Sequence, residues 1–389
     1  MDRIKKLLIY LFAKLKCLVL SPIAKLKYGK KPIWLVCERG TDARDNGYHM
    51  FRYLRKEHPE IEAWYVITRD SVDLKKITDL GNIAFRGSLN HWMLYIRTKM
   101  ILTAFQPFFC PSSSHRFYQD MIRKNRQRII FLQHGVIGTD LPLYHQDRAK
   151  FDLFICGAKP EFDYVSSHYH YTHGEVRYTG LARFDALHQF TVKRQILIMP
   201  TYRKWLRNLS EREVAQSEYV ERWNHLLDNP MLAEIAEKYK VEIIFYPHQL
   251  MQQFVGLFFS SNSHIVIANR QHYDVQPLLK ESALLITDLS SVHFDFAYMK
   301  KPVLYYQFDE EKVYKDHNAR GYFEFNKMGF GDKVRREEEL LPLIAECAAG
   351  DFRLSPKYEQ RIEGFFPLSD THNCERIYQE IVKDFGQEK

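Results

Sequence analysis

The chain alternates short, strongly apolar runs with longer polar or amphipathic segments, and this alternation limits the folds that it can adopt. Residues 31–40 read KPIWLVCERG, an apolar strand that runs into a glycine turn, and residues 48–56 follow with a helical pattern. The same rhythm continues to residue 180 and resumes from residue 195 to residue 309. Continuous apolar strands separated by helices are typical of parallel sheets that are covered on both faces.

The apolar runs fall into two series. After the run at 31–40, the first series continues at residues 62–68, 82–87, 99–105, 128–135, 153–158 and 176–180. The second series occupies residues 195–203, 241–249, 264–269, 283–288 and 302–309. A chain of 389 residues with 46% hydrophobic and 14% aromatic content can form two cores of ordinary size. We therefore predict an α/β protein with two αβα domains that face each other across a cleft, with ligands beyond the carboxyl ends of the strands.

The short polar stretch HQFTVKR at 188–194 separates the two series, so the predicted domains are 29–190 and 191–389. A last helix that packs back on the N-terminal domain remains an alternative. The formal charge of +8 favours an acidic partner such as a phosphorylated substrate or an anionic lipid, with no indication of nucleic acid. Six scattered cysteines without a CxxC pair indicate neither a zinc site nor a disulfide framework, which favours a reducing compartment.

Residues 1–28 form a basic and apolar segment before the first series. Nine Lys and Arg and one acidic residue lie within 1–31, and Lys14 and Lys16 interrupt the apolar runs. No uninterrupted apolar run approaches the roughly 20 residues that a membrane span needs. We predict an amphipathic helix that lies on an anionic membrane surface, with a first helix packed on the domain as the alternative.

Reactive side chains follow four of the apolar runs. His134 ends the run IIFLQ and precedes a glycine, which places an imidazole where a proton could be transferred. Thr201 and Arg203 follow ILIMP, and a guanidinium group suits phosphate oxygens. His248 follows VEIIFYP in the second series. Each of these residues could instead have a structural role, because exposed basic loops and half-buried histidines are common.

The fourth place is the stretch LITDLSSVHFDFAY at 285–298. Asp288 ends an apolar run, and Ser290 and Ser291 lie where a helix is expected to begin. Hydroxyl and amide groups at such a position can bind a phosphate, although the same residues also form ordinary helix caps.

The order of these motifs resembles one known family. LQHG, TGLARFD, PTYR, YPHQ, the stretch from HYDVQ through TDLSSVHFD to KKPVLYYQFD, and ARGYF follow one another between about 130 and 330. This pattern is similar to that of the CDP-glycerol:poly(glycerophosphate) glycerophosphotransferases of teichoic acid synthesis and their CDP-ribitol-using relatives. Gln133 stands where that family usually has tryptophan, and Tyr202 also replaces a tryptophan.

The resemblance implies a GT-B-like fold made of two Rossmann-type domains, in which the C-terminal domain holds most of the CDP group. It implies catalytic roles for His134 and His248. It also implies substrate contacts from Thr201, Arg203, Ser290, Ser291 and Arg320. Asp288 is a further candidate for substrate binding, and Tyr273 and Asp274 of the HYD segment are candidates for contact with the cytidine, with a turn at a strand end as the alternative. No cofactor is expected; no carboxylate cluster indicates a metal, and a supporting magnesium ion is left open.

The expected activity is transfer of glycerol phosphate from CDP-glycerol to a hydroxyl of a lipid-linked glycan or growing phosphopolymer, in teichoic acid or capsule synthesis. The expected location is the cytoplasmic face of the cell membrane, as a peripheral protein. Three alternatives stay open: a CDP-ribitol ribitolphosphotransferase, a GT-B glycosyltransferase that uses a nucleotide sugar, and an inactive membrane-bound scaffold.

Overall fold

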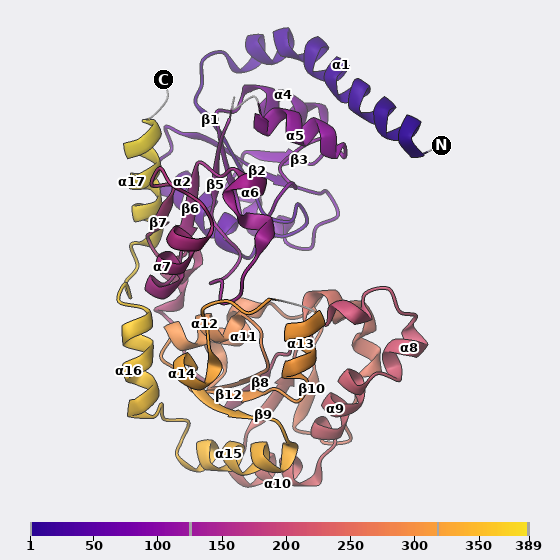
Figure 1. The fold of residues 1–389 in the computed structure, drawn as a ribbon, viewed down its shortest axis with the longest axis vertical. Helices are drawn as coiled ribbons and strands as arrows, with labels where there is room; N and C mark the ends of the chain where they lie inside the picture. The colour runs from indigo at the N-terminus through magenta and orange to yellow at the C-terminus, as the bar shows by residue number, and fades with distance from the viewer. Residues whose placement is uncertain (1, 124–126, 317–318, 387–389) are drawn as a thin grey trace. The chain divides into compact units, whose positions relative to one another are not determined.

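The computed structural model describes residues 2–123, 127–316 and 319–386, and the chain divides into two compact units (Figure 1). The first unit contains residues 1–134, 142–186 and 370–389, and the second contains residues 135–141 and 187–369. Each unit is built on one sheet in which all strands are parallel. The predicted α/β class with two Rossmann-type units is confirmed, whereas the predicted boundaries at 28/29 and 190/191 remain predictions.

The first unit has a seven-stranded sheet in the order β3-β2-β1-β4-β5-β6-β7. Its strands are β1 (Ile33–Cys37), β2 (Glu62–Ile67), β3 (Ile83–Phe85), β4 (Met100–Thr103), β5 (Arg128–Phe131), β6 (Leu153–Cys156) and β7 (Val176–Tyr178). All residues of β1, β4 and β6 are buried, as expected for strands covered on both faces.

The helices of the first unit are mostly short crossovers between these strands. They are α1 (Asp2–Tyr28), α2 (Asn46–Glu57), α3 (Leu74–Thr78), α4 (Leu89–Arg97), α5 (His115–Arg123), α6 (Gln146–Ala149), α7 (Lys159–His168) and α17 (Asn373–Phe385), with 3₁₀ turns η1 (Pro142–Tyr144) and η2 (Ala182–Leu187). Ser88 illustrates how they begin: its hydroxyl accepts a hydrogen bond from the amide of His91 at the start of α4.

The second unit has a six-stranded sheet in the order β10-β9-β8-β11-β12-β13. Its strands are β8 (Gln195–Ile198), β9 (Glu242–Phe245), β10 (Ile265–Ile267), β11 (Leu284–Thr287), β12 (Val303–Tyr306) and β13 (Gly331–Val334). The first five match apolar runs of the second series. The sequence Gly-Asp-Lys-Val of β13 gave no strand signal, because an edge strand with two charged or polar positions lacks the apolar run on which the prediction depended.

The helices of the second unit cover both faces of its sheet. They are α8 (Glu211–Ala215), α9 (Glu218–Leu227), α10 (Pro230–Tyr239), α11 (Val275–Glu281), α12 (Val292–Tyr298), α13 (Glu310–Asp316), α14 (Phe325–Met328), α15 (Glu337–Ala349) and α16 (Pro356–Phe365), with 3₁₀ turns η3 (Lys204–Leu206) and η4 (Gln249–Leu257). Trp223 of α9 is fully buried and packs against Phe245, Tyr306 and Phe308.

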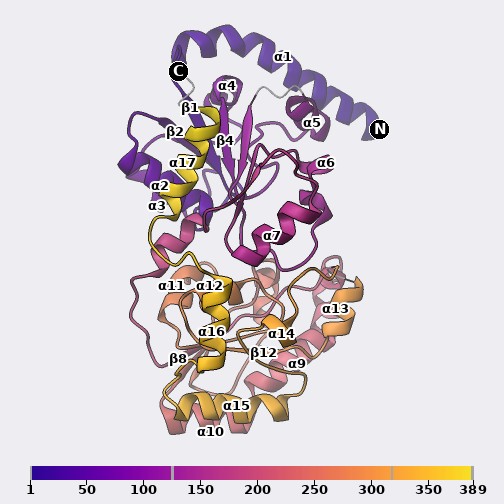
Figure 2. The same ribbon diagram turned by 60° about the vertical axis from the view of Figure 1, so that its left-hand side comes forward.

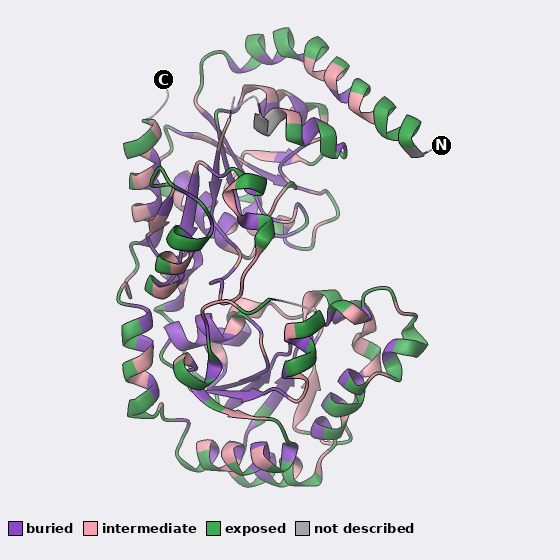
Figure 3. Cartoon of the chain, in the orientation of Figure 1, coloured by how far each residue is buried: buried purple, intermediate pink, exposed green. Residues whose placement is uncertain are grey.

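Helix α1 combines features of the two alternatives from the sequence, a helix packed on the domain and a helix with an apolar face available to a membrane surface. Its buried residues Ala13, Leu20 and Ala24 mark the side on which it packs against α4 and α5. Its remaining surface is largely exposed (Figure 3) and carries ten large apolar side chains: Ile4, Leu7, Leu8, Leu11, Phe12, Leu15, Leu18, Val19, Ile23 and Leu26. The predicted N-terminal helix is therefore present and docked, and it also presents an exposed apolar face.

The length and composition of α1 require one correction. Residues Arg3–Tyr28 have a mean hydropathy of 1.9 over their most apolar window and are long and apolar enough to cross a membrane. The sequence analysis expected no membrane-spanning length because it considered only uninterrupted apolar runs. An 18-residue window of α1 that contains two lysines still has a strongly apolar mean hydropathy. A single helix of this kind close to the N-terminus is weak evidence for a span.

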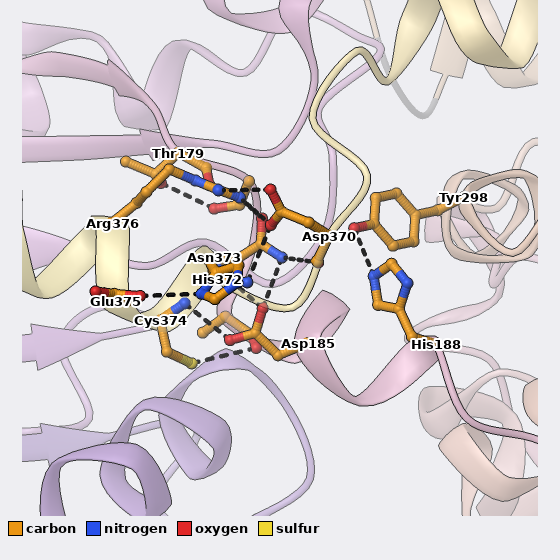
Figure 4. Close-up of polar contacts among 12 residues, drawn as sticks. Thr179, Asp185, His188, Tyr298, Asp370, His372, Asn373, Cys374, Glu375 and Arg376 are labelled. Carbon is orange, nitrogen blue, oxygen red and sulfur yellow. Dashed lines mark hydrogen bonds and ion pairs between the residues drawn. The ribbon is translucent and has the colours of Figure 1, made fainter. Parts of the chain in front are cut away.

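The last helix belongs to the first unit, where α17 lies beside α2 (Figure 2). Asp185, from the TGLARFD motif, accepts hydrogen bonds from the amides of Asn373 and Cys374 at distances of 2.8 and 2.9 Å (Figure 4). Arg376 donates to the carbonyl of Thr179 at 2.8 Å. These bonds satisfy the amides at the start of α17 and attach the helix to the loop that follows β7.

Gly180 allows this attachment because it has no side chain. Its φ of +78° lies in the left-handed region, and a Cβ atom there would lie 1.8 Å from Oδ1 of Asn373. Gly87 has a similar φ of +76° but no heavy atom within 4 Å of the corresponding Cβ position. Substitution of Gly87 by alanine therefore tests backbone strain alone, whereas substitution of Gly180 tests the same strain together with a clash against Asn373.

We expect Gly180→Ala to lower the free energy of unfolding more than Gly87→Ala does, as measured by urea denaturation. Gly87→Ala should cost about 1–2 kcal/mol, the usual cost of a left-handed conformation for an L-residue. Gly180→Ala should cost about 1–3 kcal/mol more, because Asn373 must move. Equal losses in the two variants would contradict a tight contact between Gly180 and Asn373.

Candidate active site

His134 lies beyond the carboxyl end of β5 in the first unit. The chain turns sharply after Leu132, because Gln133 has a φ of +59°, a left-handed conformation that is uncommon for a residue with a side chain. The imidazole ring of His134 stacks on Phe105, with ring centres 4.4 Å apart, and meets the edge of Tyr144 at 6.2 Å. The ring is thus oriented by two aromatic neighbours.

Asn46 holds the turn that carries His134. This fully buried side chain donates to the carbonyl of Gln133 at 2.9 Å and accepts a hydrogen bond from the amide of Arg183 at 3.0 Å. The guanidinium group of Arg183 pairs with Asp45 at 2.7 Å. The start of α2, the turn after β5 and the TGLARFD motif are therefore joined by one amide side chain, which helps to offset the strain at Gln133.

The surroundings of His134 favour a neutral ring. Burial, together with the positive charges of Arg39 and Arg183, lowers the pKa of His134 from 6.5 to about 3, and the backbone of Ala104 opposes this shift only in part. An uncharged imidazole at neutral pH can accept a proton. A group with so low a pKa is nevertheless a weak base unless an anion offsets the nearby cations.

In the second unit, Asp288 organises the loop that follows β8. Its Oδ1 atom accepts hydrogen bonds from the amide and hydroxyl of Thr201 at 2.8 and 2.7 Å, and its Oδ2 atom lies 2.7 Å from Nη2 of Arg203. Arg203 also forms two hydrogen bonds to Asp309, at 2.7 and 2.8 Å. Three predicted site residues, Thr201, Arg203 and Asp288, are thus in direct contact.

Arg203 and Asp288 are both fully buried, so the ionised form of each is stabilised by the opposite charge of the other. Although burial alone would raise the pKa of Asp288, the charge of Arg203 and the bonds from Thr201 hold it below the ordinary value. Burial also opposes the charge of Arg203, whereas Asp288 and Asp309 raise the pKa of this guanidinium group above its ordinary range. In this structure Arg203 positions the loop; its contact with substrate remains a prediction.

The serine pair follows Asp288 at the start of α12. Ser290 is buried and Ser291 is exposed. Ser291 has a helical conformation, with φ of −62° and ψ of −10°, and its side chain forms no capping hydrogen bond. The side chain of Ser291 therefore does not cap α12, which was the structural alternative that the sequence allowed.

His248 lies beyond the carboxyl end of β9, as predicted from the YPHQ motif. Its Nδ1 atom accepts a hydrogen bond from the amide of Leu250 at 3.2 Å, so a neutral ring carries its proton on Nε2. The ring lies nearly parallel to Tyr202, with centres 6.0 Å apart and an interplanar angle of 27°. Tyr202 therefore connects His248 with the loop that contains Thr201 and Arg203.

The remaining predicted residues have other partners. Asp274 is the N-cap of α11 and accepts a hydrogen bond from the amide of Gln276 at 3.4 Å. The amide of Tyr273 donates to the carbonyl of Asn269 in the preceding turn. Arg320 is exposed and stacks over Tyr314 at 4.3 Å.

The segment after Arg320 packs closely on the segment that follows His134. A Cβ atom on Gly321 would lie 2.6 Å from the carbonyl oxygen of Gly138, and the amide of Phe323 donates to that oxygen at 3.2 Å. Residues 135–141 and the RGYF motif therefore form one packed element within the second unit.

Sequence reasoning did not identify several of the residues around these sites. Asn46, Arg39 and Phe105 contact or influence His134 from distant positions in the chain, and Asp309 completes the pairing of Arg203. The position of Asn46 at the start of a helix was the local signal among them. Across residues 2–123, 127–316 and 319–386, no group of three or more His, Cys, Asp or Glu side chains is arranged to hold a metal ion.

Two Rossmann-type units with parallel sheets, and with histidines and phosphate-compatible groups beyond the carboxyl ends of their strands, define a GT-B-like α/β fold. A sequence model of the CDP-glycerol:poly(glycerophosphate) glycerophosphotransferases matches residues 20–383. The chain belongs to this family, and the match extends well beyond the 130–330 region in which the motifs lie.

Named relatives agree with this assignment. The chain is 31% identical over 377 residues to the minor teichoic acid biosynthesis protein GgaB of Bacillus subtilis (strain 168), covering 92% of this chain and 40% of that protein. It is 22% identical over 397 residues to the teichoic acid poly(glycerol phosphate) polymerase of the same strain, covering 92% of this chain and 50% of the polymerase. The chain thus spans half or less of the length of these relatives.

The fold also resembles a solved structure. The wall teichoic acid polymerase TagF superposes with a TM-score of 0.66 at 15% identity, covering 99% of this chain and 98% of that one. At this level of identity the similarity concerns the fold alone.

We expect Arg203→Met to lower the free energy of unfolding at neutral pH by about 3–5 kcal/mol, because two buried carboxylates lose their cation. The loss should shrink as the pH falls and Asp288, whose pKa Arg203 helps to hold below the ordinary value, becomes protonated. Urea denaturation at several pH values measures both effects.

Arg222→Met is the matched control, since Arg222 forms an exposed pair with Glu218 at 3.6 Å. Such pairs typically contribute about 1 kcal/mol or less. A loss for Arg203→Met as small as that of the control would show that the buried pairing does not stabilise the second unit.

Proposed function

We propose that the chain transfers glycerol phosphate from CDP-glycerol to a hydroxyl group of a lipid-linked glycan or growing phosphopolymer and releases CMP. The observation that carries this proposal is family membership over residues 20–383, and the placement of His134 and His248 beyond the ends of parallel strands supports it. The bond that forms joins the acceptor oxygen to the phosphorus nearest glycerol. The bond that breaks joins this phosphorus to the oxygen that leaves with CMP.

His134 is the proposed base for the acceptor hydroxyl. Its ring is held by Phe105 and Tyr144, and its Nδ1 atom is buried, so Nε2 is the nitrogen that a hydroxyl would reach. The neutral ring takes the proton as the oxygen attacks. An imidazole fixed by stacking also loses little orientational freedom when substrate binds.

The donor diphosphate is the proposed ligand of the second unit. His248 would donate from Nε2 to an oxygen of the leaving group, since its Nδ1 atom is already an acceptor for Leu250. The hydroxyls of Ser290 and Ser291, and the cation of Arg320, would add donors. Thr201, Arg203 and Asp288 would hold the loop on which these contacts depend, and Tyr273 and Asp274 would border the cytidine.

Helix α1 is the proposed membrane contact, at the cytoplasmic face where a lipid-linked acceptor would be presented. Its exposed apolar side chains are accompanied by exposed Arg3, Lys5, Lys6 and Lys25. Apolar burial into the headgroup region and attraction to anionic lipids act together in such helices. The docking of α1 on α4 and α5 would keep the first unit close to the lipid surface.

We expect His134→Gln and His248→Gln each to reduce CMP release by at least about 10²-fold, the usual effect of losing an acid–base or charge-stabilising group. The assay compares CDP-glycerol, CDP-ribitol and a nucleotide sugar as donors with a synthetic lipid-diphosphate acceptor. His173→Gln is the control, because that side chain is 82% exposed.

Two outcomes of this assay would count against the proposal. Unchanged CMP release from a folded histidine variant would remove that residue from the mechanism. Transfer of a sugar without phosphate would favour a glycosyltransferase instead.

We expect the full chain to float with anionic liposomes and to be released by high salt, because each well-placed Lys or Arg contributes about 1 kcal/mol of screened attraction. The triple variant Leu11→Gln, Leu15→Gln, Leu18→Gln should lose flotation while staying folded, since these side chains are 51%, 55% and 75% exposed. Leu143→Gln, at a 62% exposed position outside α1, should float normally. If the triple variant floats as well as the unmodified chain, the apolar face of α1 does not bind the membrane.

A further inference from the structure

Residues 135–141 follow His134 directly in the chain but belong to the second unit. The first unit contains the chain up to His134 and continues from Pro142, whereas residues 135–141 are part of the second unit. Val136 and Ile137 are buried, with only 2% and 4% of their surface exposed. Segment 135–141 is therefore an integral part of the unit that is proposed to bind the donor.

Both ends of segment 135–141 lead to the surroundings of the His134 ring. His134 precedes the segment, and Tyr144, whose ring meets the imidazole at 6.2 Å, lies three residues beyond its last residue. Only three residues separate His134 from Gly138. A displacement of this segment would thus act on the imidazole and on one of its two aromatic neighbours together.

The RGYF segment lies against segment 135–141, backbone to backbone. A Cβ atom on Gly321 would lie 2.6 Å from both the carbonyl oxygen of Gly138 and the Cα atom of Thr139, whereas Cβ atoms essentially never come within 3.0 Å of such atoms. The amide of Phe323 donates to the same carbonyl at 3.2 Å. This close approach requires a residue without a side chain at position 321.

A second backbone contact lies on the other side of Arg320. Asp140 and Ala319 form an antiparallel bridge. Arg320, the proposed cation for the donor diphosphate, is therefore flanked by two residues, Ala319 and Gly321, that are both held against segment 135–141. A ligand that orders Arg320 would also order this segment, because the two backbones are in contact on both sides of the arginine.

Segment 135–141 also contacts the helix that follows the serine pair. The Cβ position of Gly138 lies 3.1 Å from Cβ of Phe323 and 3.3 Å from Cζ of Phe294, which is in α12. The rings of Phe294 and Phe323 meet edge to face, with centres 5.0 Å apart. Because α12 begins directly after the serine pair, the segment touches both of the elements that carry proposed donor contacts.

We propose that Gly138 and Phe323 are positioning residues for His134, because they join the segment that follows this histidine to the elements of Arg320 and the serine pair. A donor bound at these elements holds the base in place, so the donor binds before the acceptor is activated. This inference rests on the proposed function, in which His134 accepts the proton of the acceptor hydroxyl. A misplacement of about 1 Å can reduce a rate by roughly 10²-fold, so the position of the ring matters for turnover.

The first measurement needs no ligand. The ring signals of His134 are followed by NMR in the full chain with labelled histidine, and they are identified among the 17 histidines by their loss in His134→Gln. Gly321→Ala places a methyl group against the backbone of segment 135–141 and should shift these signals. Gly364→Ala is the matched control and should leave them unchanged, because no heavy atom lies within 4 Å of its Cβ position.

The second measurement adds CDP without an acceptor. We expect CDP to change the His134 signals of the unmodified chain. Phe323→Leu should still bind CDP but lose most of this change. The same variant should lower kcat for CMP release at least about tenfold and leave KM for CDP-glycerol nearly unchanged, as expected when orientation is lost and donor binding is kept.

Phe325→Leu is the matched control for Phe323→Leu. Phe325 meets Phe323 edge to face at 5.1 Å in the same aromatic cluster, but the atoms closest to Gly138 belong to Phe323 and Phe294. Phe325→Leu should therefore keep the response of His134 to CDP. A direct effect of CDP on the ring, without segment 135–141, would appear equally in Phe323→Leu and would overturn the inference.

The outcomes separate this inference from the proposed function. Unchanged His134 signals in a folded Gly321→Ala variant would overturn the inference even if CMP release is intact. If that variant does not fold, the response of Phe323→Leu decides, and if CDP does not bind, the comparison of Gly321→Ala with Gly364→Ala decides. Coupling in a chain that releases no CMP from any CDP-alditol would support the positioning residues and count against the transferase proposal.

Discussion

Parallel strands cannot be joined by tight turns, and most features of both units follow from this constraint. Each strand is followed by a crossover that returns over one face of the sheet, so both faces are covered and the strands themselves are apolar. Side chains with chemistry are then confined to the segments just beyond the strands. Because all strands in a sheet point the same way, these segments gather at one edge.

Polar groups that lie at a buried edge of a sheet each need a hydrogen-bond or ion-pair partner. Glu38, directly after β1, is fully buried, and burial and Asp45 raise its pKa. Its carboxyl group accepts hydrogen bonds from the amides of Arg44, Asp45 and Tyr48, which lead into α2. Asp288 plays the same part after β11, where it holds the loop of Thr201 and Arg203. Glu38 and Asp288 thus position the segments on either side of them through hydrogen bonds and ion pairs.

The sequence was sufficient to predict all the observed strands except β13, because buried parallel strands are continuous apolar runs. It was also sufficient to predict His134 and His248 as residues at strand ends. It could not show that Asn46 supports the turn at Gln133, since 87 residues separate the two. Nor could it show that Arg203 is paired with both Asp288 and Asp309, because an arginine after a strand has the same local pattern whether it is exposed or buried. Partnerships across the sheet depend on strand order, which local patterns do not encode.

The position of α17 in the first unit has a consequence for how the chain is made. The first unit is interrupted by residues 187–369, and its last helix is bonded to Asp185 and Thr179 only after that insertion has been translated. Between Asp185 and Asn373 there are roughly 190 residues, which a ribosome adds in about 10–40 s. During this interval α17 is not yet available to cover the side of α2 against which it packs. The first unit therefore cannot be completed until α17 has been translated, so the rate of translation sets the earliest time at which this unit is fully folded.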